Sequence, residues 1–169
     1  MSIASQALGA GVITERRLTI SSRSPRAEKL GQWSAVNWTS DNAALVRQSD
    51  VVVLSVRPHQ FFDLSIQADG KLVISVMAGV SLKTLQTRLG TTRVVRAMPN
   101  TPAAIGRGIT VAVPDKSVGS GQRAIADALL AATGKIEWLD DEALMDAVTA
   151  VSGSGPAYVF LLAEELARA

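Results

Sequence analysis

The chain has 169 residues, of which 47% are hydrophobic and 19% are charged, as expected for a globular chain of one domain or slightly more. The net charge of +2 comes without a basic tract, and aromatic residues make up only 4%, so a nucleic-acid-binding surface is not expected. The absence of cysteine and the single histidine exclude disulfides, a thiolate nucleophile and a zinc site built from these residues.

Short β-branched runs alternate with helical patterns along the first 140 residues. We expect strands at 18–21, 51–56, 72–77, 93–97 and 109–113, and helices at 3–11, 43–48, 82–89 and 121–132. Asp41 and Ser81 are suited to cap two of these helices, and Gly90 and Gly134 to end two. The alternation predicts an α/β fold, a Rossmann-like, doubly wound and mostly parallel sheet with helices on both faces. The run Val51–Leu54 is apolar on both sides, so we expect it to be buried.

The last part of the chain has no strand pattern. Residues 142–151 are helical in pattern, Ser152-Gly153-Ser154-Gly155-Pro156 interrupts them, and 157–169 form an apolar helix. We therefore place a boundary near Leu139–Asp141, with an α/β domain at 1–140 and the start of an all-helical domain at 141–169. The apolar surface of the final helix is typical of a face that meets another helix or subunit.

Ser22 and Arg23 follow the strand expected at 18–21. In α/β dinucleotide-binding folds, the residues at this place contact the adenosine ribose, and an arginine with small hydroxyl residues favours the 2′-phosphate of NADP. An ordinary solvated loop is the alternative interpretation.

Three further motifs follow strand ends, where ligands bind in open α/β sheets. Arg57, in Ser55-Val56-Arg57-Pro58-His59, is expected near a pyrophosphate or ribose, or is a surface cation. The small residues of Ser75–Gly79 allow close approach of a cofactor, or form only a tight turn. In Met98–Pro102 the two prolines predict an extended, non-helical loop, in which Asn100 can orient a nicotinamide amide or a small polar substrate. A purely structural turn is the alternative.

The segment Ser152–Pro156 has glycines next to the start of a helix. Exposed backbone N–H groups there favour an anion such as a carboxylate, which makes Ser152, Gly153, Ser154 and Gly155 candidate substrate contacts. A flexible linker between helices is the alternative. No catalytic side chain and no metal ligand is assigned within the chain.

Taken in order, these stretches resemble the pyrroline-5-carboxylate reductases over nearly the whole chain. The two motifs most specific to that family are Met98-Pro99-Asn100-Thr101-Pro102 and Ser152-Gly153-Ser154-Gly155-Pro156-Ala157-Tyr158. At the strand before Pro58 the family usually has Ala-Val-Lys-Pro, so Ser55 and Arg57 are conservative departures.

The resemblance implies a Rossmann domain that binds NADPH or NADH, followed by a helical domain that forms an interlaced homodimer. It implies hydride transfer to the C=N carbon of 1-pyrroline-5-carboxylate, which gives L-proline, with positioning as the main source of catalysis. Carried over by position, the cofactor contacts are Ser22, Arg23, Asn42, Val56, Arg57, Ala78, Met98, Pro99 and Asn100.

By the same resemblance, the family's first strand and its Gly-x-Gly loop would precede Met1, so we expect a sheet that lacks its first strand. The family's Thr- and Gly-rich substrate loop and most of its dimer helices would follow Ala169. We therefore expect little or no reductase activity from the chain alone. Two alternatives are a non-catalytic NADP-binding or interaction protein and another Rossmann reductase, against which the two specific motifs argue. No apolar run approaches the roughly 20 residues of a membrane helix, and no signal-peptide pattern opens the chain, so a cytoplasmic location is expected.

Overall fold

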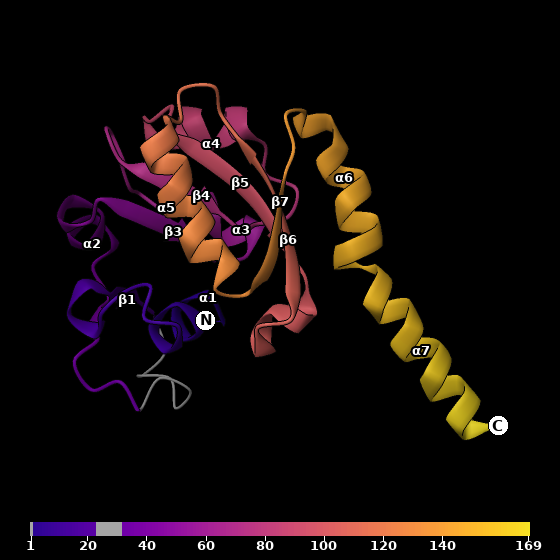
Figure 1. Ribbon diagram of the computed structural model, residues 1–169. Helices are drawn as coiled ribbons and strands as arrows, with labels where there is room; N and C mark the ends of the chain where they lie inside the picture. Colours follow the sequence, from indigo (N-terminus) through magenta and orange to yellow (C-terminus); the bar gives the residue numbers. More distant parts are fainter. Residues whose placement is uncertain (1, 23–31) are drawn as a thin grey trace.

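The computed structural model describes residues 2–22 and 32–169 and contains a five-stranded sheet (Figure 1). The strands stand in the order β3-β4-β5-β6-β7. Their bounds are β3 Val51–Leu54, β4 Leu72–Ser75, β5 Val94–Pro99, β6 Gly108–Pro114 and β7 Gly134–Trp138. The first three strands are parallel, β6 is antiparallel to β5, and β7 is parallel to β6. The carboxyl ends of β3, β4 and β5 therefore share one edge of the sheet with the amino ends of β6 and β7.

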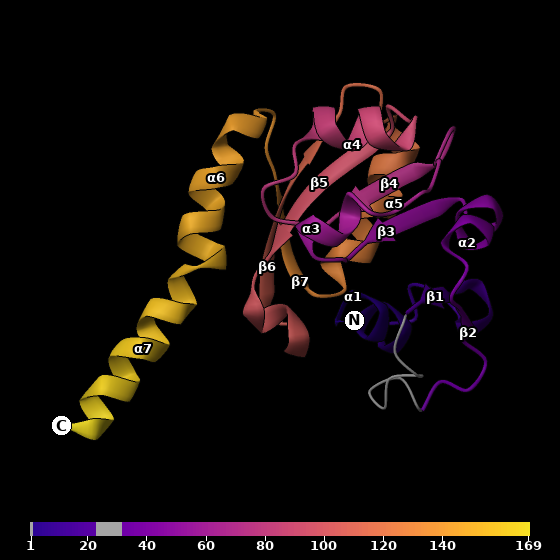
Figure 2. The same cartoon turned by 180° about the vertical axis from the view of Figure 1, so that it is seen from behind.

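Helices cover both faces of this sheet, as Figures 1 and 2 show from opposite sides. On one face, α3 (Pro58–Phe61) and α4 (Leu82–Leu89) bury Phe61, Leu85 and Leu89 against Val52, Leu54 and Val73. On the other face, α5 (Ser120–Ala131) buries Ala126, Leu129 and Leu130 together with Ala7 of α1 (Ser2–Gly9) against Ile74, Val95 and Ala112. Burial of apolar side chains on two faces is what a doubly wound sheet requires, so the expected fold class is confirmed.

A second, two-stranded sheet lies beside α1. It pairs β1 (Thr19–Ser21) with β2 (Asn37–Thr39) in parallel, after the short 3-10 turn η1 (Glu15–Arg17). The helix α2 (Asn42–Gln48) connects it to β3, and the Asp41 carboxylate caps α2 by accepting from Ala44 N. Within the described residues, hydrogen bonds between strands join β1 only to β2 and not to the larger sheet.

A helical arm leads away from the sheet after β7. It consists of η4 (Glu142–Leu144), α6 (Met145–Val148), the π-helical turn η5 (Thr149–Gly153) and α7 (Gly155–Arg168), which projects into solvent (Figure 1). Six large apolar side chains of α7 are 57–69% exposed: Tyr158, Val159, Phe160, Leu161, Leu162 and Leu166. Among the described residues, no helix is long and apolar enough to cross a membrane.

Several expectations need correction. Pro102 lies inside the 3-10 helix η3 (Thr101–Ile105), so the Met98–Pro102 segment is not extended throughout, because proline is tolerated in a first helical turn. Ser152 and Gly153 do not interrupt the helical arm but belong to its π-helical turn η5, so only Ser154 separates η5 from α7. The run Val51–Leu54 is not buried on both sides as expected. It forms β3, an edge strand of the described sheet, in which Val53 is 38% exposed.

The pKa of Asp115, which follows β6, lies below its ordinary value. Burial opposes ionisation of this carboxyl, but hydrogen bonds outweigh it, from the backbone and hydroxyl of Ser117, from Gln86 and from the backbone of Lys116. The Gln86 amide donates to Asp115 at 2.7 Å, and Ser117 donates from its backbone N at 2.9 Å. The carboxylate thus connects α4 to the loop that precedes α5.

Candidate functional site

The pairing register places three of the expected cofactor contacts at equivalent points on one edge. Leu54 is paired with Ser75, and Ser75 with Arg96. Arg57, Ala78 and Pro99 each lie three residues beyond one of these register partners. Because the three strands are parallel, these positions follow the same direction of chain and gather at the carboxyl edge of the sheet.

The turns after β3 and β4 are open to solvent at this edge. Arg57 and Ala78 are exposed, and Val56 is half-buried. Arg57 precedes α3, whose Gln60 side chain accepts from the Arg57 backbone N at 3.4 Å. Gly79 has a φ of +69°, and a Cβ added there would meet no atom within 4 Å. These two turns therefore offer small residues and the exposed cation of Arg57 to a ligand.

Ser22 and Asn42 lie at the end of the smaller sheet. Ser22 directly follows β1 and is exposed, and Asn42 is the first residue of α2. The hydroxyl of the adjacent Ser21 donates to Asn42 Oδ1 at 2.5 Å, which joins β1 to α2. Arg23 lies outside the described residues, so its proposed contact with a 2′-phosphate stays a prediction.

The segment after β5 is held in place by its own side chain. Asn100 Oδ1 accepts from Ile109 N at 2.9 Å, across the antiparallel turn between β5 and β6. The amide oxygen is thus engaged in the fold, and the Asn100 NH₂ group remains the donor for a ligand. Met98 is buried, whereas Pro99 and Asn100 are half-buried.

A hollow of about 430 Å³ lies beside Asn100 at the same edge. Arg107 and Lys135, at the starts of β6 and β7, contribute two exposed cations to its lining. The spacing of its wall depends on Gly134, where a Cβ would lie 2.1 Å from the Gly108 carbonyl oxygen. Sequence reasoning took Gly134 for a helix stop and missed this close backbone approach.

The segment expected to contact substrate, Ser152–Gly155, lies next to Met98, which begins the segment expected at the nicotinamide. A Cβ placed on Gly153 would lie 3.9 Å from the sulfur of Met98 and 3.6 Å from Cγ2 of Thr149. The Ser154 N–H donates to Thr149 O at 2.8 Å, so it is used inside the arm and not offered to an anion. The Ser152 hydroxyl is buried without a hydrogen-bond partner in the described part of the chain. The role of Ser152, Gly153, Ser154 and Gly155 in substrate binding stays a prediction.

Sequence reasoning missed the ion pair that fixes the arm to the sheet. Arg96, on β5, is buried, and its Nη1 donates to Glu142 Oε1 at 2.9 Å. The same Glu142 oxygen accepts from the backbone N of Leu82 at 2.8 Å. The only available signal was a charged residue inside an otherwise apolar strand, since residues of a sheet buried on both faces are rarely charged without a partner.

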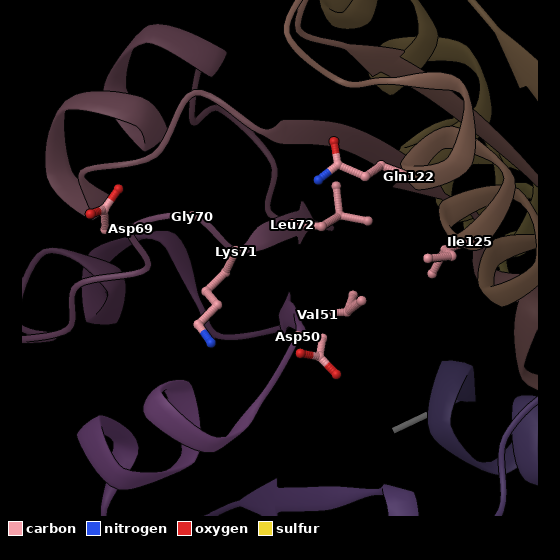
Figure 3. Close-up of a pocket in the computed structure, with 8 residues that line it drawn as sticks. All are labelled: Asp50, Val51, Asp69, Gly70, Lys71, Leu72, Gln122 and Ile125. Carbon is pink, nitrogen blue, oxygen red and sulfur yellow. The ribbon is translucent and has the colours of Figure 1, made fainter.

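A second hollow, of about 410 Å³, lies at the opposite edge of the sheet (Figure 3). Asp50 and Val51 line it at the start of β3, Lys71 and Leu72 at the start of β4, and Gln122 and Ile125 come from α5. Amino ends of parallel strands are not where open α/β sheets bind their ligands. This hollow is therefore separate from the candidate site.

Two family models match the chain. The one described as NADP oxidoreductase coenzyme F420-dependent matches residues 1–79, and the one described as pyrroline-5-carboxylate reductase dimerisation matches residues 142–169. A pyrroline-5-carboxylate reductase of Pseudomonas aeruginosa is 44% identical over 151 residues, which cover 85% of this chain and 55% of that protein. This chain belongs to the pyrroline-5-carboxylate reductase family.

Solved structures of the family have the same fold. The pyrroline-5-carboxylate reductase of Coxiella burnetii matches with a TM-score of 0.82 and 34% identity, over 98% of this chain and 64% of that one. The Plasmodium falciparum pyrroline carboxylate reductase, solved with NADP bound, matches with a TM-score of 0.80 and 28% identity, over 98% of this chain and 62% of that one. This chain therefore spans 55–64% of the length of these three reductases.

Proposed function

We propose that this chain forms the cofactor-binding part of a pyrroline-5-carboxylate reductase that uses NADPH, or NADH, to reduce 1-pyrroline-5-carboxylate to L-proline. The observation that carries the proposal is the shared edge. The register places Arg57, Ala78 and Pro99 at equivalent points beyond parallel strands, and the arm sets Gly153 beside Met98 at the end of β5. Membership of the family supports the choice of substrate.

The residues at this edge fit a dinucleotide. Exposed Ala78 and Gly79 leave the backbone after β4 open, and Arg57 supplies a cation to a phosphate or ribose. We assign Ser22 and Asn42 to the adenosine side, together with Arg23, which follows Ser22 in sequence. An arginine and a serine, without an acidic residue, favour NADP over NAD.

Positioning accounts for most of the chemistry that we assign to these residues. A bound reduced nicotinamide would supply a hydride to the imine carbon, and a proton from water would complete the amine at the nitrogen. In this proposal Val56 and Ala78 contact the cofactor, and Pro99 and buried Met98 border the nicotinamide ring. The Asn100 amide oxygen is held by Ile109 N, so its NH₂ group is oriented to donate to a carboxamide. No side chain of this chain is assigned as an acid or a base.

We further propose that residues 1–140 and 141–169 are separate domains, and that the second one assembles with a second copy of the chain. The match of 142–169 to a dimerisation model and the exposed apolar side chains of α7 support this. A small-molecule substrate and a cytoplasmic location complete the proposal.

The test is NADPH binding and oxidation by the purified chain and by an Arg57→Ala variant. A lost charge-assisted hydrogen bond costs about 1.5–3 kcal/mol, so NADPH binding should weaken roughly tenfold or more, measured by nicotinamide fluorescence. Lys116→Ala removes a charge from the loop after β6, at the opposite edge, and should leave binding unchanged.

Binding with turnover of 1-pyrroline-5-carboxylate supports the reductase. Binding without turnover favours a non-catalytic NADP-binding role for this chain. Absence of NADPH binding, or equal effects of the Arg57 and Lys116 substitutions, would contradict the proposed site.

A further inference from the structure

The buried guanidinium of Arg96 depends on one carboxylate. Arg96 is 5% exposed, and its Nη1 lies 2.9 Å from Glu142 Oε1. Its Nη2 lies 3.6 Å from Asp146 Oδ1, but the Asp146 side chain is 91% exposed, so water screens that pair. A buried charge without its partner is strongly unfavourable, and Glu142 is the partner that prevents this.

The same carboxylate oxygen also fixes the turn that follows β4. Glu142 Oε1 accepts from Leu82 N, the first N–H of α4, at 2.8 Å. Between β4 and Leu82 the chain passes through exposed Ala78, a proposed cofactor contact, and Gly79, and we call this part the cofactor turn. It then passes through Ser81, which caps α4. One oxygen atom of Glu142 therefore holds the end of the cofactor turn.

Glu142 also begins the helical arm. From it the arm runs through Met145, which packs with Met98 and Val111, to Gly153 beside the Met98 sulfur. Arg96 itself precedes Met98 by two residues on β5. Three segments thus meet at Glu142. They are the cofactor turn, strand β5, whose end carries Met98 and Pro99, and the arm that carries the proposed substrate segment.

We propose that Arg96 and Glu142 are positioning residues, which set the placement of the arm, with Ser152–Gly155, relative to the cofactor turn at Ala78 and Gly79. The inference rests on the proposed function for its catalytic consequence, and on contacts alone for its structural one. Arg96 is buried, and the Glu142 carboxylate is engaged by Arg96 and by Leu82 N, so both act through the segments that they hold and not by contact with substrate. A shift of the arm by a fraction of an ångström changes the distance between a hydride donor and its acceptor, which depends steeply on geometry.

The experiment measures the arm directly. Because the chain has no cysteine, Lys83→Cys on α4 and Ala150→Cys on η5 provide two exposed sites for spin labels. Labelled chains diluted with unlabelled chains report the distance within one copy. We expect a narrow distance distribution in the parent and in Asp146→Ala, and a clearly broader one in Glu142→Ala. Glu142→Gln keeps an amide oxygen that accepts from Arg96 and Leu82 but loses the negative charge, so its distribution should be narrower than that of Glu142→Ala.

A second variant removes the Leu82 contact of Glu142, and Leu82→Ala, which keeps the N–H but loses the same side-chain packing against the cluster of Met98 and Met145, is its matched control. Leu82→Pro removes the N–H that donates to Glu142 at a first helical position, where proline is tolerated, and Ser81 already has the extended backbone that precedes a proline (φ −73°, ψ 158°). Where the purified parent chain turns over 1-pyrroline-5-carboxylate, Glu142→Ala and Leu82→Pro should each lower kcat at least tenfold. The Kd for NADPH should change less than threefold in both variants. Loss of folded protein alone would lower the active fraction but not kcat per folded chain.

An unchanged distance distribution in folded Glu142→Ala would overturn the proposal, whether or not the parent chain is active. A distribution in Glu142→Gln as broad as that of Glu142→Ala would equally contradict it. If Glu142→Ala does not fold, Leu82→Pro decides instead, and an unchanged distance distribution or an unaltered kcat in that variant would contradict the proposal. Failure of the parent to bind NADPH contradicts the proposed function but leaves the distance result valid.

Discussion

Substitution of Leu162 by alanine tests whether a second copy of the chain covers α7. The helix is apolar on all sides from Tyr158 to Leu162, a pattern found in helices that are buried. Leu162 is 61% exposed in the single chain. Full burial of a leucine contributes about 1.5–3 kcal/mol, so covering this exposed part contributes about 1–2 kcal/mol per copy.

A symmetric dimer contains the residue twice, so Leu162→Ala should weaken association by about 2–4 kcal/mol, which is roughly 30- to 700-fold in Kd. Sedimentation equilibrium over a range of concentrations measures this directly. Glu165→Gln, on the same helix, is the matched control, since its exposed carboxylate pairs only with Arg168 and such pairs contribute little.

An unchanged Kd for Leu162→Ala in a chain that does assemble would place the interface elsewhere. Equal weakening by Glu165→Gln would show that the apolar area is not what drives association. A parent chain that stays monomeric at all accessible concentrations would refute the assignment of α7 as an interface between copies.

Three further substitutions test the fold that supports the site. Gly134→Ala places a Cβ 2.1 Å from a β6 carbonyl oxygen at a φ of +136°, and should lower the free energy of unfolding by at least about 2 kcal/mol. Gly70→Ala is the control, because at a φ of +71° with no atom within 4 Å it carries only the cost of the backbone conformation. Thermal unfolding of the two variants compares these costs. Leu85→Ala leaves a cavity in a fully buried cluster, so the urea midpoint should shift by an amount equivalent to about 2–5 kcal/mol, at constant slope. Although burial opposes ionisation of Asp115, its hydrogen bonds lower the folded pKa, so its stabilisation is complete above the unfolded pKa of about 3.9 and is lost as pH falls through the folded pKa. Asp115→Asn should flatten this acid-side decline in an unfolding titration, and an acid-side slope equal to that of the parent would contradict the assignment.

Local chemistry explains why much of the fold was predictable. The Asp41 and Ser81 caps and the left-handed Gly90 at the end of α4 were all expected from residue type, and all three are observed. The five expected strands occur within a few residues of their predicted bounds, since β-branched runs mark buried strands well. The edge positions Arg57, Ala78 and Asn100 followed from the rule that ligands bind beyond strand ends.

Features that depend on distant contacts were not predictable in the same way. β7 has only five residues, in which Lys135 and Glu137 alternate with Ile136 and Trp138, and this pattern is too short to distinguish a strand from a solvated loop until β6 pairs with it. The Arg96–Glu142 pair spans 46 residues, and neither residue type nor spacing indicates that the two meet. The helical state of Ser152 and Gly153 likewise comes from the arm on either side of them.

The reversal of β6 gives the Met98–Pro102 motif its rigidity. Because β6 runs antiparallel to β5, the amide of Ile109 returns to the end of β5 and donates to Asn100 Oδ1. A parallel β6 would begin at the opposite edge, and Asn100 would then have no backbone donor nearby to fix its side chain. The motif is therefore held from both sides, by the strand before it and by the start of the strand after it. A ring that binds against Pro99 and Asn100 would meet a wall that needs no rearrangement, which is the condition that hydride transfer by positioning requires.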